Sequence, residues 1–152
     1  MQQITFEELT ERSGLEFVRE VFGLDVRPPI ISDVLGMRLV DATEGEVVFA
    51  VDADAALGNL AGTVHGGLLA TLLDSAMACA VHTTLPARTD YGTVDLHVTF
   101  VRAAPTDGRP LRAVGTVVHS GRTLVTAEAK VVDADGRLLA HATSSCLIRR
   151  GR

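Results

Sequence analysis

A single acidic residue lies inside an otherwise apolar stretch of the chain, and it is the first candidate for chemistry. Asp74 is the only acidic or basic side chain between His65 and His82. Burying a carboxylate among apolar side chains costs free energy unless the group is paired or takes part in a reaction. Asp74 is therefore a candidate general base. The alternative is a helix-interior aspartate that reaches solvent or bonds a neighbouring hydroxyl, such as that of Thr71 or Ser75.

The start of this stretch, His65-Gly66-Gly67, is the second candidate. If a helix begins here, its first backbone N–H groups have no partner within the helix, and its dipole places partial positive charge at this end. Two glycines also allow a ligand to approach the backbone closely. Such a site can bind an anion, or a carbonyl oxygen on which negative charge develops. The alternative is a glycine-rich turn that packs tightly against a strand.

The spacing of the two candidates limits how they can act together. Gly66 and Asp74 are eight residues apart, which is about 12 Å along a helix axis at 1.5 Å per residue. Reacting atoms must lie within roughly 3–3.5 Å of one another, so one helix cannot place both groups on one carbonyl. If both take part, one of them comes from a second subunit. The sequence thus predicts a homodimer or homotetramer with composite sites at the dimer interface.

The elements that must hold these residues are one long helix and several strands. Residues 65–83 predict the helix, because leucine, alanine and methionine dominate the run and Leu85-Pro86 follows it. The run is apolar on nearly all sides, so the helix should be buried. Six segments predict strands, at residues 35–40, 46–52, 92–102, 111–119, 122–132 and 137–148. Short turns such as Ser120-Gly121 and Asp135-Gly136 join the last strands, which predicts antiparallel pairing.

Residues 1–30 predict an N-terminal helical extension. Thr5 and Glu8 have the spacing of a capping box, and Ser13-Gly14 would divide the segment into two short helices. Residues 28–31, which begin with two prolines, predict an extended connection. Together the elements predict an α+β fold of one domain over residues 1–152. In this fold a curved antiparallel sheet of about six strands wraps around the long apolar helix.

The composition limits the classes of function. The chain has 152 residues, of which 47% are hydrophobic, and this suits one globular domain with a substantial core. Its net charge of -5 is unlike that of a nucleic-acid-binding protein. No apolar run reaches the ~20 residues that cross a bilayer, and the polar N-terminus is unlike a signal peptide. Cys79 and Cys146 lie in apolar segments rather than in a disulfide framework. We therefore expect a cytoplasmic protein without a nucleic-acid or membrane partner.

Other common catalytic chemistries leave no pattern in the sequence. The five histidines are scattered, with no second ligand at the spacing that metal sites use. No G-x-S-x-G motif indicates a serine nucleophile, and no dinucleotide or P-loop fingerprint is present. Cys79 is expected to be a small core residue, because it lies among alanines. We therefore expect neither a metal nor a cofactor.

Residues 57–148 resemble the hot-dog thioesterases of the PaaI-like family, acyl-CoA hydrolases that include the phenylacetate-pathway and human THEM-type enzymes. The resemblance rests mainly on NLAGTVHGG at residues 59–67 and LLDSA at residues 72–76. TVDL at residues 93–96, SGRT at residues 120–123 and DGRLLA at residues 135–140 add to it. It implies a hot-dog fold and an acyl-CoA thioesterase activity, in which CoA is part of the substrate and not a cofactor.

The resemblance also implies a role for each matching residue. Asp74 would be the general base or nucleophile, and the backbone N–H of Gly66 in the other subunit would polarise the thioester carbonyl. His65 would hold the turn or contact the thioester. Asn59 would help to position the attacking water or the substrate, and Thr93 would orient the water.

The role implied for Thr93 raises a geometric problem. Strict alternation along residues 92–102 places Thr93 on the face opposite Val94 and Leu96. Either the site lies on the polar face of this strand, or a bulge at Gly92 turns the chain.

Binding of CoA requires cations for its phosphates. Arg102, at the end of a predicted strand, and Arg122, in a predicted turn, are the candidates, because a guanidinium group matches the geometry of a phosphate. Arg88 and Arg109 are weaker candidates. For each of them, an arginine that simply covers the surface is the alternative.

Two other functions stay open for the same fold. A hot-dog dehydratase would pair a histidine with a carboxylate to move a proton at an acyl chain, but a second carboxylate-bearing loop is not evident. A non-catalytic acyl-CoA-binding module should lack the helix carboxylate, and Asp74 is present. The sequence therefore favours the thioesterase and leaves the acyl group undetermined.

Overall fold

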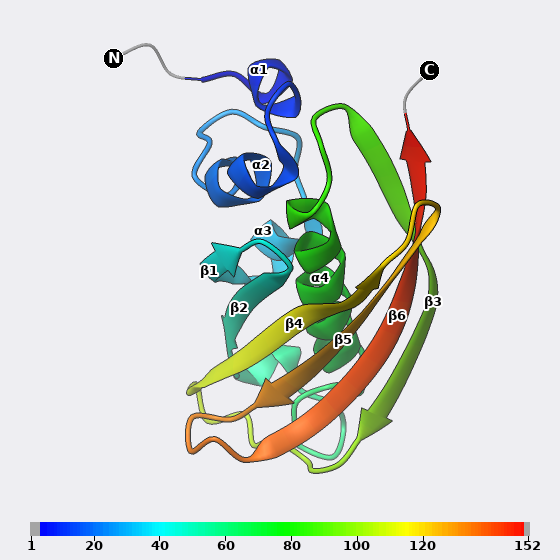
Figure 1. The fold of residues 1–152 in the computed structure, drawn as a ribbon. Helices are drawn as coiled ribbons and strands as arrows, with labels where there is room; N and C mark the ends of the chain where they lie inside the picture. The colour runs from blue at the N-terminus through cyan, green and yellow to red at the C-terminus, as the bar shows by residue number, and fades with distance from the viewer. Residues whose placement is uncertain (1–3, 151–152) are drawn as a thin grey trace.

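The computed structural model describes residues 4–150, except for the side chain of Arg150. One sheet of six strands curves around the long helix α4 (Gly66–Thr83), as Figure 1 shows. The order across the sheet is β1-β2-β4-β5-β6-β3, and every neighbouring pair is antiparallel. The predicted α+β hot-dog fold is confirmed. The strands are β1 (Arg38–Thr43), β2 (Glu46–Asp52), β3 (Thr89–Phe100), β4 (Pro110–Ser120), β5 (Leu124–Val132) and β6 (Leu138–Arg150).

Helix α4 fills the concave side of the sheet because most of its surface is apolar. Its buried side chains include Leu69, Leu72 and Met77. The strands present small residues where the helix crosses them, so that the two backbones come close. A Cβ on Gly115 of β4 would lie 2.4 Å from the carbonyl group of Ala76, and only glycine permits this approach. The helix bounds agree with the predicted residues 65–83.

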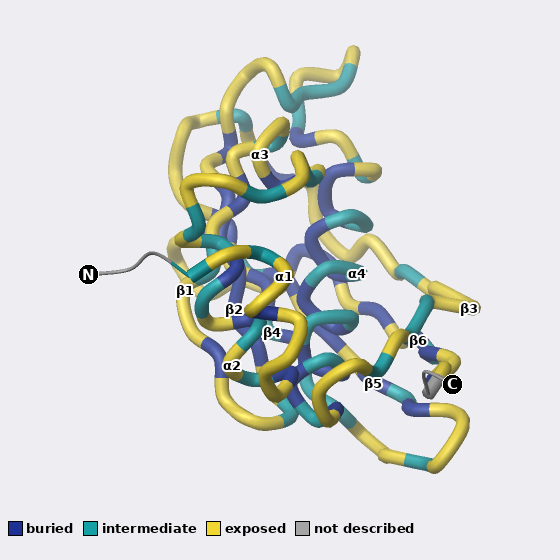
Figure 2. Tube along the Cα trace, turned by 90° about the horizontal axis from the view of Figure 1, so that it is seen from above, coloured by how far each residue is buried: buried dark blue, intermediate teal, exposed yellow. Residues whose placement is uncertain are grey.

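Strand β3 forms one edge of the sheet and pairs only with β6. It is 12 residues long, and within residues 4–150 no strand pairs with its other side. Seen from above in Figure 2, it lies exposed beside α4. Its apolar side chains share this exposure: Val94 is 56%, Leu96 37% and Phe100 54% exposed. A long apolar edge of this kind is a template for pairing with another chain.

The predicted N-terminal helices are present. Helices α1 (Phe6–Thr10) and α2 (Gly14–Val21) each begin with a capping box, at Thr5 and Ser13 respectively. The backbone N–H of the first α2 residue donates to the carbonyl of Leu85 (2.9 Å), just beyond the end of α4. The extension therefore packs on the C-terminal end of the central helix.

The expected extended connection at residues 28–31 is wrong at its end, because helix α3 (Ile31–Leu35) begins there. The carboxylate of Asp33 accepts hydrogen bonds from the backbone N–H of Ile30 (3.1 Å) and from Arg27 (2.8 and 2.6 Å), which anchors the first turn. Gly36, with a φ of 67°, ends the helix in the left-handed region. Strand β1 consequently begins later than predicted.

The other strands agree with their predicted ranges to within three residues at each end. A single 3-10 turn, η1 (Ala55–Leu57), lies in the loop before α4. The prediction of one domain over residues 1–152 stays a prediction, because residues 1–3, 151 and 152 lie outside the described part.

Candidate active site

Asp74 lies half-buried on α4, and strand β3 holds its carboxylate. The Thr93 hydroxyl donates a hydrogen bond of 3.0 Å from Oγ1 to Asp74 Oδ1. The nearby hydroxyl of Thr71 instead donates to the backbone carbonyl of Gly67 (2.9 Å). Asp74 is thus bound from across the structure, and not by Thr71 of its own helix.

A β-bulge turns Thr93 toward the helix. The pairing between β3 and β6 shifts by one residue at Val94. Thr93 lies opposite buried Cys146 on one side of this shift, and Leu96 lies opposite buried Ser144 on the other. Paired residues share a face of the sheet, so both Thr93 and Leu96 face inward. Of the two alternatives, a site on the polar face or a bulge, the structure shows the bulge. It lies at Val94, two residues beyond Gly92, where we expected it.

Three side chains near Asp74, the thiols of Cys79 and Cys146 and the phenol of Tyr91, are protonated at neutral pH. Burial, reinforced by the charge of Asp74, raises the pKa of the Cys79 thiol to about 12. Burial also raises the pKa of Tyr91 well above its usual value and raises the pKa of the Cys146 thiol. Neither thiol is therefore an activated nucleophile. Cys79 packs against the core, as the sequence predicted.

His65 caps helix α4 with its side chain. The backbone N–H of Gly67 donates to His65 Nδ1 (2.8 Å), and the backbone N–H of His65 donates to the carbonyl of Leu57 (2.9 Å). Because Nδ1 accepts, the proton of the neutral ring lies on Nε2. No group in the described part of the chain accepts that proton. The imidazole therefore holds the turn and keeps one donor for a ligand.

Gly66 is the first residue of α4, and no residue between 4 and 150 accepts a hydrogen bond from its N–H. The ring of Phe100 covers one side of it, because a Cβ on Gly66 would lie 3.2 Å from a ring carbon. A groove of about 300 Å³ opens beside Gly66, and Asn59 and Arg102 line it. The structure thus brings an unpaired N–H, a loop asparagine and an arginine to one groove.

Asn59 organises the loop that leads into α4. Its Oδ1 accepts from the backbone N–H groups of Ala61 (2.9 Å) and Thr63 (3.2 Å), and its Nδ2 donates to Thr63 Oγ1 (2.9 Å). The side-chain amide is therefore largely engaged within the loop. Asn59 shapes the approach to Gly66 chiefly through the backbone that it holds.

Comparison with known proteins places this geometry in a family. The family model described as Thioesterase superfamily matches residues 61–140, more than half of the chain. The chain belongs to the Thioesterase superfamily. The enzyme class predicted from the sequence, a thioester hydrolase, is the class of this family.

Two related proteins and one solved structure are similar to this thioesterase-superfamily chain in sequence or in fold. Human acyl-coenzyme A thioesterase 13 is 30% identical over 130 residues, which are 84% of this chain and 91% of that protein. A Halobacterium salinarum protein named as an esterase is 38% identical over 103 residues, which span 64% of this chain and just under two thirds, 66%, of that protein. The structure of a mutant phenylacetic acid degradation protein PaaI from Thermus thermophilus has a TM-score of 0.70 and 29% identity, over 76% of this chain and 96% of that one. The PaaI-like resemblance is confirmed.

The thioesterase-superfamily chain places its two predicted CoA-binding arginines at opposite ends of β3. Arg102 follows the end of β3 and lines the groove beside the start of α4. Arg122 lies in the turn between β4 and β5, next to Thr123, whose carbonyl accepts from the N–H of Ile148 (2.8 Å). Ile148 in turn pairs with Tyr91, near the start of β3. One subunit therefore cannot bring both arginines to one groove.

The two weaker arginine candidates are engaged in ion pairs. Arg88 pairs with Glu11, and Arg109 pairs with Asp107 and Asp135. These ion pairs favour a structural role for both arginines over a role in CoA binding.

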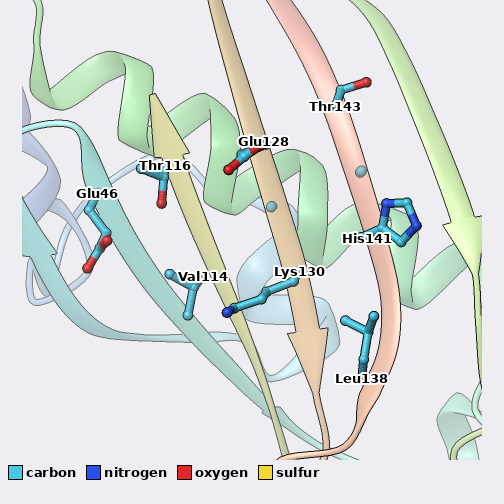
Figure 3. A pocket seen from close by; sticks show the side chains of 10 residues that line it. Glu46, Val114, Thr116, Glu128, Lys130, Leu138, His141 and Thr143 are labelled. Atoms are coloured by element: carbon cyan, nitrogen blue, oxygen red, sulfur yellow. The ribbon is translucent and has the colours of Figure 1, made fainter. Parts of the chain in front are cut away.

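A separate groove of about 410 Å³ lies on the outer face of the sheet, with α4 behind it (Figure 3). Glu46, Glu128, Lys130 and His141 are among the side chains that line it. They point outward because side chains alternate between the two faces of each strand. None of the predicted site residues lies there, so this groove is not the candidate active site.

Phe100 and helix α3 lie next to the candidate site and were not assigned to it from the sequence. Phe100 follows Leu96 and Val98 in the row of β3 side chains that face inward, and the alternation of residues in the sequence shows this row. The contact of Phe100 with Gly66 depends on how β3 packs beside α4, which the sequence does not show. For α3, a carboxylate at residue 33 followed by Gly36 was a local helix signal. The two prolines before it, Pro28 and Pro29, instead indicated an extended segment.

Two other classes of site are absent from the described part of the chain. Between residues 4 and 150, no helix is long and apolar enough to cross a membrane. Within the same range, no three His, Cys, Asp or Glu side chains lie together as a metal site would require. The expectation of no metal and no cofactor stays a prediction.

Proposed function

We propose that the chain hydrolyses the thioester of an acyl-CoA to a free acid and CoA. The observation that carries the proposal is the hydrogen bond from Thr93 to Asp74, which orients a carboxylate on an otherwise apolar helix. The unpaired N–H of Gly66, held by the His65 cap, is the second group that the reaction needs. The family and the human acyl-coenzyme A thioesterase support this activity.

In the proposed reaction Asp74 takes a proton from a water molecule, whose oxygen attacks the thioester carbonyl carbon. The N–H of Gly66 donates to the carbonyl oxygen, where negative charge develops. When the tetrahedral intermediate collapses, the C–S bond breaks and Asp74 returns the proton to the CoA sulfur. A thioester carbonyl is less stabilised by resonance than an amide, so one carboxylate and one positioned donor suffice. No step of this reaction requires a metal or a cofactor.

Asp74 has a second route open to it, as the nucleophile. Its carboxylate would attack the carbonyl carbon, release the CoA thiolate and form a mixed anhydride, which water then hydrolyses. Turnover in ¹⁸O-labelled water, followed by mass spectrometry of the peptide that contains Asp74, tests this route. Label in Asp74 identifies it as the nucleophile, because water that opens the anhydride at the Asp74 carbonyl leaves its oxygen there. Label in the free acid alone means that water attacked the acyl carbon, as on the general-base route or in an anhydride opened on its substrate side.

The proposed site is shared between two subunits of a homodimer, or of a homotetramer built from such dimers. Gly66 lies beside Phe100, at the end of β3, whereas Asp74 lies beside Thr93, near its start. If two copies pair their β3 edges antiparallel, the end of one β3 meets the start of the other. Gly66 of one copy then approaches Asp74 of its partner, which overcomes the ~12 Å between them on one helix.

The same pairing supports a shared binding site for the CoA phosphates. Arg102 follows the end of β3, and Arg122 lies near its start. In an antiparallel pair the Arg102 of one copy and the Arg122 of the other would lie at one composite site. We therefore propose both arginines as phosphate ligands, contributed by different subunits.

An assay of purified protein against a panel of acyl-CoAs, with a thiol reagent present, tests the proposal. Release of free CoA that is lost in Asp74→Asn is the expected result. A change in double-bond absorbance without CoA release would indicate the hot-dog dehydratase. Binding without turnover would indicate an acyl-CoA-binding module.

Cys79 and Cys146 are free thiols, which supports a reducing compartment, and we propose the cytoplasm.

A further inference from the structure

We propose that a groove between α3 and the start of α4 binds the hydrocarbon part of the acyl group, and that Leu35, Ile31 and Ala56 determine which acyl groups fit. This inference rests on the proposed function and specifies the substrate class of the same site.

The groove, of about 350 Å³, lies within the range of small-molecule pockets and is bounded by three elements. Helix α3 contributes Ile31 and Leu35, the η1 turn contributes Ala56 and Leu57, and α4 contributes Leu68. His65, which directly precedes the candidate oxyanion donor Gly66, also lines the groove. The groove thus reaches the start of α4, next to the place where the thioester carbonyl would bind.

The lining favours an uncharged hydrocarbon. Apart from His65, no acidic or basic side chain lines the groove. The hydroxyl of Thr71 donates its proton to the carbonyl of Gly67 (2.9 Å), so this proton is not available to a ligand. A charged or hydroxylated acyl group placed here would lose hydration along the Ile31, Leu35, Ala56, Leu57 and Leu68 side chains, and only His65 and Thr71 offer polar side-chain atoms in return. Alkyl and unsubstituted aryl acyl groups share the chemistry that this lining accepts.

Two grooves of different character flank the start of α4. Gly66 lines the groove that contains Arg102, and the neighbouring Gly67 lines the apolar groove. A thioester joins a hydrocarbon to a polar, anionic CoA arm at one carbonyl. The two grooves match these two arms, with the arginine on the CoA side. The carbonyl would then lie between them, at the unpaired N–H of Gly66.

The outer wall of the apolar groove is exposed and yet firmly anchored. Ile31 is 53% exposed, so an acyl chain would cover apolar surface that now faces water. The helix that carries it is held by the paired hydrogen bonds between Arg27 and Asp33 and by buried Ser32. Such a wall can select acyl groups by their size.

The test compares the acyl-chain profiles of kcat/KM in three variants. Ala56→Leu fills the groove from an exposed turn, and Leu35→Ala enlarges it from the opposite wall. Val34→Leu is the matched control, because Val34 lies on α3, is 82% exposed and does not line the groove. The substrates are straight-chain acyl-CoAs of increasing length, together with phenylacetyl-CoA. Thermal melts of each variant confirm that it is folded.

Ala56→Leu should lower kcat/KM for the longest good substrate by at least about tenfold, since one methylene of misfit changes discrimination by roughly that factor. Hydrolysis of acetyl-CoA should change by less than about twofold. Leu35→Ala should shift the optimum toward longer chains, and Val34→Leu should leave the profile unchanged. The straight-chain and phenylacetyl series then show which hydrocarbon the groove prefers.

Unaltered profiles in both Ala56→Leu and Leu35→Ala, with hydrolysis still abolished by Asp74→Asn, would overturn the groove assignment and leave the proposed function intact. An equal loss on acetyl-CoA and long-chain substrates in a folded variant would also overturn it. Failure of the wild-type protein to hydrolyse any acyl-CoA would overturn the proposed function and the groove together.

Discussion

Thr93 Oγ1 and Asp74 Oδ1 are joined by a 3.0 Å hydrogen bond between strand β3 and helix α4, across 19 residues of sequence. The bond occupies one carboxylate oxygen of Asp74 and leaves Oδ2 without a donor in the described part of the chain. A carboxylate held by one oxygen is oriented, and its second oxygen is free to take a proton from water. The bond therefore suits Asp74 to the role of general base.

Replacing Asp74 by asparagine should preserve the fold and lower kcat by at least about 100-fold, the usual scale for loss of a general base. The amide keeps the size of the side chain and still accepts from Thr93. Steady-state kinetics and a thermal melt measure the two effects. A loss of less than about tenfold would assign the base to another residue.

Replacing Thr93 by valine should lower kcat by roughly 10- to 100-fold and change KM little, because a hydrogen bond to a charged group contributes about 1.5–3 kcal/mol. Thr93 acts here as a positioning residue. Thr93→Ser, which restores the hydroxyl, should recover most of the activity. If serine and valine behave alike, the contact is not used in the reaction.

Adding a methyl group to Gly66 tests the close approach of the thioester. The new Cβ would lie 3.2 Å from the Phe100 ring, which is 54% exposed and can move. Gly66→Ala should therefore melt no lower than the wild type and yet lose most of its kcat/KM, with the steepest loss for bulky acyl groups. Near-wild-type turnover on every acyl-CoA would remove Gly66 from the oxyanion site.

The shared site can be tested by mixing two inactive chains. A heterodimer of Asp74→Asn and Gly66→Ala contains one intact composite site and one doubly altered site. Co-refolding the two variants should restore up to about a quarter of the wild-type activity, since half of the dimers are mixed and each has one good site of two. Sedimentation should show a dimer or tetramer. A fully active monomer, or no recovery on mixing, would contradict the composite site.

Arg102→Ala and Arg122→Ala should each raise KM for acyl-CoA more than they lower kcat, because contacts far from the thioester bind the ground state and transition state alike. A truncated thioester without the nucleotide should be insensitive to both changes. Arg88→Ala is the control, since Arg88 pairs with Glu11. Equal effects on the truncated substrate would mean that the arginines support the fold.

The half-buried His82, near the end of α4, predicts a pH dependence of stability. Burial lowers the pKa of His82 below its usual 6.5, against a smaller opposing effect of Asp90. The ring packs between those of Phe17 and Tyr91, tilted against both, with centroids 4.7 and 5.2 Å away. The unfolded chain therefore binds a proton at a higher pH than the folded chain. Stability should fall as the pH drops below about 6.5, until the folded pKa is passed.

His82→Phe keeps an aromatic ring between Phe17 and Tyr91 and removes the titrating group. Its melting temperature should fall less than that of the wild type between about pH 7 and about pH 5.5. His97→Gln, at an exposed position on β3, is the control and should behave like the wild type. A wild-type melting temperature that is constant over this range would contradict the prediction.

Helix α4 and its two candidate groups could be predicted from the sequence because their signals are local. The HGG start, the apolar run and Leu85-Pro86 specify where the helix lies, and a carboxylate inside such a run is conspicuous wherever the helix packs. The capping boxes at Thr5 and Ser13 are likewise complete within four residues. The sheet followed from alternation and short turns.

Only the tertiary structure decided which groups meet. One extra residue at Val94 reverses the faces of β3, and no local pattern shows where such a bulge falls, because the energy that selects it comes from packing against α4 and β6. The same dependence on packing brings Phe100 over Gly66 and separates Arg102 from Arg122. The sequence by itself determined the chemistry that the chain carries, and the long-range packing of the sheet on the helix determined which of these groups lie within reach of one another.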